Sequence, residues 1–264
     1  MRGVGAIAKR QTLAWQLARR EVIGRYRGSI FGLAWSFFNP LLMLIVYTTF
    51  FTQVFQARWG DQGGGKGVFA LALFVGLVIH GMVAESATRG AACIVGNPNF
   101  VKKVIFPIEI LPWATVLAAL FHALLGIAVL LFGAVVVLHG ISFLALLWPL
   151  LLLPLAFLCV GVAWLLSACA VYFRDIGQLV GLLVMVLLFT APVFFPVEGL
   201  PPGFRTIVDW NPLTYPIEQS RALLLWGEGV DWARYLRYTA CSGVFAMISL
   251  ALFRRAQRGF ADVL

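Results

Sequence analysis

The sequence predicts an all-α integral membrane protein with six transmembrane helices, an N-terminal amphipathic interface helix, and short re-entrant helices before the last span. Three observations lead to this prediction. The 264 residues are 61% hydrophobic and only 12% charged, which is too few charges for a soluble domain of this size. The apolar residues form runs long enough to cross a bilayer. The basic residues concentrate between those runs on one side.

The first predicted element is a helix over residues 9–30 that lies in the inner membrane interface. On a helical wheel, one side holds Ala14, Trp15, Ala18, Val22 and Tyr26, and the other holds Lys9, Gln16, Arg20 and Arg27. Arg25 and Ile23 break the pattern. An interfacial helix would sink its aromatic side to headgroup depth and turn its arginines toward lipid phosphate. The alternative is an ordinary basic flank of the first span.

Six apolar runs follow as predicted spans, at residues 33–55, 68–84, 113–138, 143–173, 176–197 and 235–253. Pro149 and Pro154 interrupt the fourth run, so its first part could lie at the interface. Pro192 and Pro196 stand near the end of the fifth. The segment 198–231 is rich in Pro and Gly, and its apolar piece 222–226 is too short to cross, so we expect a re-entrant hairpin on the outer side.

The charge distribution predicts that both termini are cytoplasmic. With that orientation, 14 of the 20 Lys and Arg residues lie in inner segments and 6 in outer ones, while the outer segments hold six of the eleven acids. Positive residues are retained on the cytoplasmic side. The net charge of +9 is therefore attributed to loops that face anionic lipid, and not to nucleic-acid binding.

The sequence shows no pattern for covalent chemistry, so we expect no enzyme activity, metal or cofactor on this chain. The run GGGKG at Gly63–Gly67 lacks the spacing of a phosphate-binding loop and falls on the outer side. Ionisable residues within or beside the spans are His80, Glu85 and His122. A proton relay needs a chain of such groups, so a histidine hydrogen-bonded to a neighbouring helix is the favoured interpretation of His122.

Four stretches resemble one family over nearly the whole chain. They are RREVIGRYRGSIFGLAWSFFNPLLML (19–44), NPNFVKKVIFPIEILP (97–112), YFRDIGQLVGLLVMVLLFTAPVFFP (172–196) and NPLTYPIEQSRALLLWG (211–227). In this order they resemble the ABC-2 type permeases that export polysaccharides such as O-antigen, teichoic acid and capsule. The resemblance implies a single transmembrane domain over 1–264 in the bacterial inner membrane. It also implies a homodimer paired with two copies of a separate ATPase subunit, which would hold ATP and Mg.

The function expected from this resemblance is export of a lipid-linked polysaccharide, with O-antigen of lipopolysaccharide as the first choice. Teichoic acid, capsule, or a drug or lipid are the alternatives within the superfamily. A membrane scaffold or channel subunit is the alternative from another class.

Three sets of residues are candidates for function. A translocation path is predicted on one face of the first span, with an opposite wall on the fifth, because aromatic rings and hydrogen-bonding groups suit a sliding sugar polymer. Its residues are Phe31, Trp35, Phe38, Thr49, Gln53, Gln178, Met185 and Phe189. The alternative is that these rings pack on neighbouring spans or sit in the aromatic belt.

The second set is expected to couple the chain to the ATPase, through the long inner segment 88–106 and the turn between the fourth and fifth spans. Its residues are Asn97, Pro98, Phe100, Lys102, Lys103, Arg174 and Asp175. The third set, Arg25 and Arg27, would contact the pyrophosphate of the lipid carrier. The alternative for these two arginines is that they only anchor the interface helix.

Overall fold

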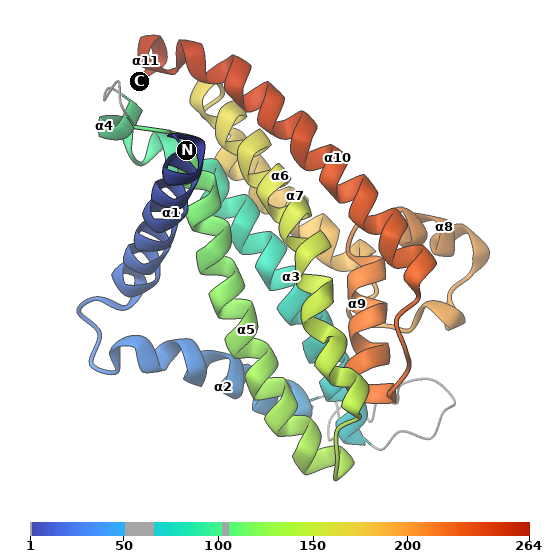
Figure 1. The fold of residues 1–264 in the computed structure, drawn as a ribbon. Coiled ribbons are helices and arrows are strands. Elements are labelled where there is room, and N and C mark those ends of the chain that lie inside the picture. Colours follow the sequence, from blue (N-terminus) through green and yellow to red (C-terminus); the bar gives the residue numbers. More distant parts are fainter. Residues whose placement is uncertain (1, 51–65, 102–105) are drawn as a thin grey trace.

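The protein is a bundle of long helices with short helices at both ends (Figure 1). The computed structural model describes residues 2–50, 66–101 and 106–264, and within these ranges it contains no strand. The long helices are α1 (Arg2–Tyr26), α2 (Trp35–Thr49), α3 (Lys66–Val95), α5 (Ile110–Leu138), α6 (Leu152–Tyr172), α7 (Ile176–Thr190) and α10 (Trp232–Ala256). The short ones are η1 (Gly32–Ala34), α4 (Pro98–Val101), η3 (Phe143–Leu151), η4 (Val197–Gly199), α8 (Pro202–Trp210), α9 (Thr214–Arg221), η5 (Ala222–Trp226), η6 (Gln257–Gly259) and α11 (Phe260–Val263).

Among the described residues, five helical stretches are long and apolar enough to cross a membrane. They are Gly32–Thr49, Gly67–Val95, Ile110–Leu138, Phe143–Tyr172 and Trp232–Val263. Helix α7 is apolar but has only 15 residues, about 22 Å of helix. Its shortness has a local cause, because Ala191 precedes Pro192 and adopts extended backbone (ψ 151°), as residues before proline do. The predicted all-α membrane fold is confirmed, and the fifth predicted span ends as a helix at Thr190.

Helix α3 is the centre of the bundle, and α5, α6, α7 and α2 all pack on it. Small residues allow the backbones to approach closely, as is usual between membrane helices. A Cβ on Gly90 of α3 would lie 2.8 Å from the Cα of Ala163 on α6, and one on Gly161 of α6 would lie 3.1 Å from the Cα of Ala246 on α10. These contacts fix the order α3, α6, α10 across the bundle.

The second predicted span is longer than 68–84, because α3 continues to Val95. Residues 88–95 of the predicted coupling segment are therefore the last turns of α3, and only α4 forms a separate helix there. The polar residues Glu85 and Arg89 end the hydrophobic run, but they find partners on α1 and α5, so the helix does not need to stop. Lys102 and Lys103 lie outside the described residues, as do Gln53 and the glycines at 63–65.

The segment 198–231, predicted to lie on the outer side, contains the end of η4, helix α8 and the continuous α9–η5. Short helices before the last span are therefore present, as predicted. A buried arginine on α9 ties the segment to the bundle: Arg221 is 2% exposed, and its guanidinium donates to the carbonyls of Ala72 (2.9 Å) and Val193 (3.0 Å). Trp148 Nε1 of η3 donates to Ser220 Oγ (2.9 Å). The segment is thus held against α3 by hydrogen bonds in an apolar setting, where they are hard to replace.

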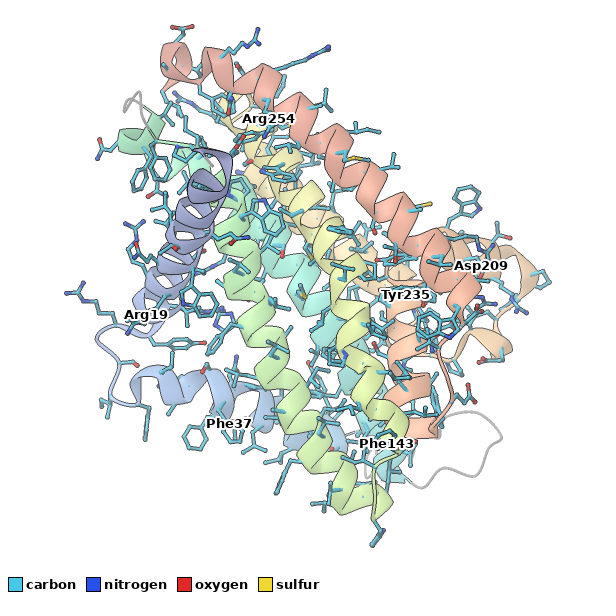
Figure 2. The ribbon with its side chains drawn as sticks, viewed as in Figure 1. Arg19, Phe37, Phe143, Asp209, Tyr235 and Arg254 are labelled. Carbon is cyan, nitrogen blue, oxygen red and sulfur yellow. The ribbon has the colours of Figure 1, made fainter. Side chains whose placement is uncertain are left out.

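Of the five long apolar stretches named above, the one that contains α2 is the least covered. Only 11% of the stretch Gly32–Thr49 is buried, and in Figure 2 the side chains along α2, Phe37 among them, stand clear of the bundle. An apolar helix that a single chain leaves so uncovered must face lipid or another protein.

Candidate functional site

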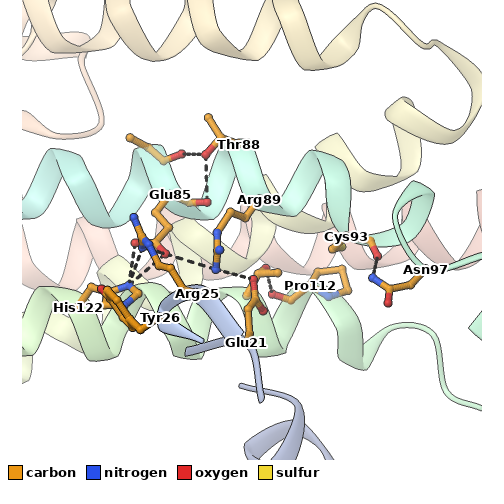
Figure 3. Close-up of polar contacts among 12 residues, drawn as sticks. Glu21, Arg25, Tyr26, Glu85, Thr88, Arg89, Cys93, Asn97, Pro112 and His122 are labelled. Atoms are coloured by element: carbon orange, nitrogen blue, oxygen red, sulfur yellow. Dashed lines mark hydrogen bonds and ion pairs between the residues drawn. The ribbon is translucent and has the colours of Figure 1, made fainter. Parts of the chain in front are cut away.

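A cluster of five polar residues lies where α1 meets α3 and α5 (Figure 3). Helix α1 supplies Glu21 and Arg25, α3 supplies Glu85 and Arg89, and α5 supplies His122. Arg25 Nη1 lies 2.9 Å from Glu85 Oε1, and His122 Nδ1 lies 3.0 Å from Glu85 Oε2. Arg89 Nη1 lies 2.9 Å from Glu21 Oε1 and 3.7 Å from Glu85 Oε1. Glu85 is therefore the hub, with partners from all three helices.

His122 Nδ1 lies between two groups that favour different roles for it. An ionised carboxylate only accepts hydrogen bonds, so the contact with Glu85 favours a hydrogen on Nδ1, whereas Arg25 Nη1, which only donates, lies 3.2 Å from the same nitrogen. The hydroxyl of Tyr26 lies 3.4 Å from Nε2. The imidazole thus connects α5 to α1 and α3 together, which agrees with the prediction of a histidine bonded to a neighbouring helix.

The position of Arg25 explains why it breaks the amphipathic pattern of α1. The buried stripe of this helix, which packs on α5, includes Leu17, Ala18 and Val22. Glu21 and Arg25 follow Leu17 at intervals of four residues, so they share the protein-facing stripe. Trp15 was predicted to sink to headgroup depth in the membrane; it is 64% exposed and lies outside the protein-facing stripe.

Glu21 sits in a half-buried environment. Burial raises the pKa of its carboxyl above the ordinary value, and the guanidinium of Arg89 opposes that rise. Sequence reasoning missed Glu21. The signal that could have revealed it is the i, i+4 spacing of Glu21 and Arg25 on the apolar side of a membrane-proximal helix.

Two cavities flank the cluster. The first, of about 300 Å³, is an open hollow bordered by the end of α1 and by α2, α3 and α5. Its polar end is formed by Arg25, Tyr26, Glu85 and His122, and most of its remaining wall is apolar. The second, of about 290 Å³, lies on the other side of the Glu21–Arg89 pair, against Arg20 and Asn97. The ion pairs of the cluster therefore separate the two cavities, at the place where α1 packs against α3 and α5.

Those residues of the predicted translocation path that the structure describes are exposed in the single chain. Phe31, Trp35 and Phe38 are 58%, 39% and 43% exposed. The Phe31 ring contacts the rings of Trp35 and Phe38 edge to face, with centroids 5.6 Å and 6.2 Å apart. Thr49, at the end of helix α2, is also exposed.

On α7, Gln178, Met185 and Phe189 are exposed as well. Helices α2 and α7 each pack on α3, and their predicted faces stay uncovered within one chain.

The predicted coupling residues that the structure describes lie at one end of the molecule, where α4, the α6–α7 turn and both termini are found (Figure 1). Asn97 Nδ2 donates to the Cys93 carbonyl (2.9 Å) at the end of α3, and Pro98 begins α4. The Phe100 ring stacks on the Phe106 ring, with centroids 4.5 Å apart. The guanidinium carbon of Arg20 lies 5.7 Å from the centroid of the Phe100 ring. This cation–π geometry links α1 to the coupling segment. Arg174 and Asp175 are exposed in the α6–α7 turn.

The two arginines predicted to contact the lipid carrier have different surroundings. Arg25 pairs with Glu85 inside the cluster, although 41% of its side chain is exposed. Arg27 lies in the turn after α1 and is exposed.

A bundle of long apolar helices with a partly buried polar cluster between them defines a multi-pass membrane protein. The model of the ABC-2 type transporter family matches residues 12–225, and the chain belongs to this family. The chain is 27% identical over 252 residues to the O-antigen export system permease protein RfbA of Klebsiella pneumoniae, covering 94% of this chain and 93% of that protein. It is 25% identical over 248 residues to RfbA of Myxococcus xanthus, with 93% of each chain covered. The polysialic acid transport protein KpsM of Escherichia coli is 25% identical over 248 residues, covering 89% and 90%.

Proposed function

We propose that this chain is the permease subunit of an ATP-driven exporter that moves a lipid-linked polysaccharide, O-antigen of lipopolysaccharide, across the bacterial inner membrane. The observation that carries the proposal is the match to O-antigen export permeases over more than nine-tenths of both chains. In this proposal both termini are cytoplasmic, and two copies of the chain work with two ATPase subunits that hold ATP and Mg.

The uncovered faces of α2 and α7 support a path formed by two copies of the chain. Their exposed groups combine rings with an amide and a hydroxyl, in Trp35, Phe38, Gln178 and Thr49. Rings stack on the C–H faces of sugars, and amides and hydroxyls exchange hydrogen bonds with sugar hydroxyls. Many weak contacts of this kind let a polymer slide.

The coupling end supports transmission of ATPase motion to the spans. Phe100 stands at this end in contact with α1 through Arg20, and α1 leads directly into the η1–α2 region. A rigid-body displacement of α4 would therefore be carried along α1 to the predicted path face.

The test of function is a deletion of the gene followed by complementation with this chain. We expect the deletion to remove O-antigen from the surface and to leave lipid-linked polymer inside, and the complemented strain to recover. Capsule is the second candidate, because KpsM is also similar over most of its length. Loss of capsule with O-antigen intact would favour that candidate, and two unchanged glycans would contradict polysaccharide export.

The test of the path is the double variant Trp35→Ala with Phe38→Ala. Both rings are partly exposed, so their removal should leave the membrane level and ATPase binding normal while surface polysaccharide falls and lipid-linked polymer accumulates. The matched control is Phe143→Ala, which removes a ring that is 85% exposed at the other end of the bundle. Normal export by the well-assembled double variant would remove these two rings from the path.

A further inference from the structure

The cavity beside the cluster has the shape and polarity of a site for a lipid head. Its volume of about 300 Å³ is at the lower end of pockets that hold small ligands, about 300–1,000 Å³. Arg25, Tyr26 and His122 line one end, and Phe74, Leu77 and other apolar side chains of α2, α3 and α5 line the rest. A molecule that fits both parts carries a polar head on an apolar tail.

The polar end lies at the depth where a lipid head resides. From Gly67 to Ala84 the apolar part of α3 rises about 27 Å, close to the roughly 30 Å of hydrocarbon in a bilayer. Glu85 is the next residue, and α1 covers it from the side on which both termini lie. In the proposed orientation this is the cytoplasmic leaflet, from which a lipid-linked polymer departs.

The charges of the cluster balance, and this decides how an anion could enter. Two arginines, Arg25 and Arg89, face two carboxylates, Glu21 and Glu85. An anionic head brought beside Arg25 would therefore meet the charge of Glu85 as well, and like charges at contact distance repel. The site can accept an anion at Arg25 only if the ion pair between Arg25 and Glu85 breaks.

Glu85 can release Arg25 without being left unpaired. It keeps His122 at 3.0 Å and Arg89 at 3.7 Å, and its side chain is only 15% exposed, whereas that of Arg25 is 41% exposed. An arginine that is open on one side can pair with a phosphate in the cavity, and guanidinium–phosphate pairs are strong and directional.

We propose that this cavity binds the phosphate-bearing head of a lipid, and that Glu85 occupies the anion's place on Arg25 in the structure described here. The phosphate replaces Glu85 on Arg25, the apolar tail lies along α2, α3 and α5, and Tyr26 and His122 border the head. This inference rests on the proposed function for the identity of the lipid as the carrier of the exported polymer. Its chemistry, a phosphate head on an apolar chain, is shared with membrane phospholipids.

Binding would also change how α1 is held. The Arg25–Glu85 pair joins the end of α1 to α3, and the Glu21–Arg89 pair joins it one turn earlier. When the first pair is exchanged for a phosphate, only the second remains as an ion pair between the two helices. Arrival of the lipid thus loosens the end of α1 next to α2, while the contact of Arg20 with the coupling segment is unchanged.

The experiment measures binding of farnesyl pyrophosphate to the full-length chain purified in detergent micelles. Glu85→Gln removes the competing charge and keeps the shape, so the affinity should rise about 5-fold or more, a usual size for coupling between contacts. Arg25→Gln should abolish the binding. Inorganic pyrophosphate should bind more weakly than the prenyl compound to both the wild type and Glu85→Gln, because it lacks the tail.

Two matched variants control for charge alone. Glu109→Gln neutralises a carboxylate of similar exposure, 16%, that pairs with Arg254 elsewhere (3.0 Å), and Arg19→Gln neutralises another exposed arginine of α1. Both should bind as the wild type does. The assay is repeated with phosphatidylglycerol to identify which lipid the site binds. If only phosphatidylglycerol binds more tightly to Glu85→Gln and is lost with Arg25→Gln, the site belongs to a membrane phospholipid. If only farnesyl pyrophosphate behaves in this way, the site belongs to the carrier.

The proposal is overturned if Glu85→Gln binds both lipids no better than the wild type. Should Glu85→Gln fail to fold, the comparison of Arg25→Gln with Arg19→Gln decides, because equal binding by those two excludes a site at Arg25. The binding assay needs no polymer and no ATPase. If the variants show none of the expected differences in binding but the deletion strain lacks the glycan, this site is rejected and the proposed function stands. If the binding differences are seen but the deletion strain keeps its glycans, the proposed function alone is rejected.

Discussion

At the scale of single residues, the charged groups that matter most are those that two or more helices share. Glu85 receives contacts from α1, from its own helix and from α5. Arg89 stands between two carboxylates, Glu21 and Glu85. Removal of one partner from a network of this kind leaves the others without compensation in a medium of low dielectric, so the loss exceeds the value of one hydrogen bond.

We expect Arg89→Gln to destabilise the purified chain by about 1–3 kcal/mol, because it leaves Glu21 and Glu85 facing each other without the cation between them. Glu21→Gln should cost less, since burial already disfavours the charged form of this carboxyl and raises its pKa. Thermal unfolding of the two variants in the same detergent at neutral pH checks the order. An Arg89→Gln variant that is as stable as Glu21→Gln would contradict the network.

At the scale of elements, glycines and alanines set how closely the helices pack. Gly90 and Ala163 bring α3 and α6 into backbone contact, and Gly161 does the same for α6 and α10. Gly81, also on α3, has no heavy atom within 4 Å of the position that its Cβ would occupy. Two glycines on one helix thus have opposite roles, one at a tight contact and one beside open space.

This contrast gives a matched pair of variants. Gly90→Ala should lower the stability by about 1–3 kcal/mol through overpacking, because the new Cβ would lie 2.8 Å from the Cα of Ala163. Gly81→Ala should be neutral or stabilising, since alanine is favoured over glycine in a helix. Unfolding temperatures of both variants are the measurement, and similar values would mean that α3 and α6 are not in close contact.

At the scale of the whole molecule, two surfaces are candidates for contact with partners. The faces of α2 and α7 are uncovered in one chain, and the end that holds α4, the α6–α7 turn and both termini exposes Arg174 and Asp175 (Figure 1). In the proposed function, the first would contact a second copy of the chain and the second an ATPase. Both assignments require that the end with the termini faces the cytoplasm.

The orientation is tested by labelling single cysteines in intact cells, in a chain whose native cysteines are replaced by serine. A cysteine at Gly203, in the exposed helix α8, should react with an impermeant reagent from outside. One at Gly5 should react only after permeabilisation. The reverse pattern would invert the topology and would place α8 and not α4 on the side of ATP hydrolysis.

The sequence alone determined the class of this protein and the approximate positions of its apolar helices, and it predicts the side of the membrane on which its basic residues gather. These follow from run lengths, proline positions and basic residues, each of which acts locally or through a simple count. It also predicted that the first span carries an aromatic face, because helical periodicity places Phe31, Trp35 and Phe38 together.

The tertiary structure alone decided which polar residues meet. Arg25 lies 60 residues from Glu85, and His122 lies 37 residues from it, so no local pattern joins them. Likewise, the burial of Arg221 against Ala72, 149 residues away, depends on how the outer segment folds back on α3. An arginine enters such a site only when packing supplies acceptors for its donors, and packing between distant segments is what a single sequence does not display.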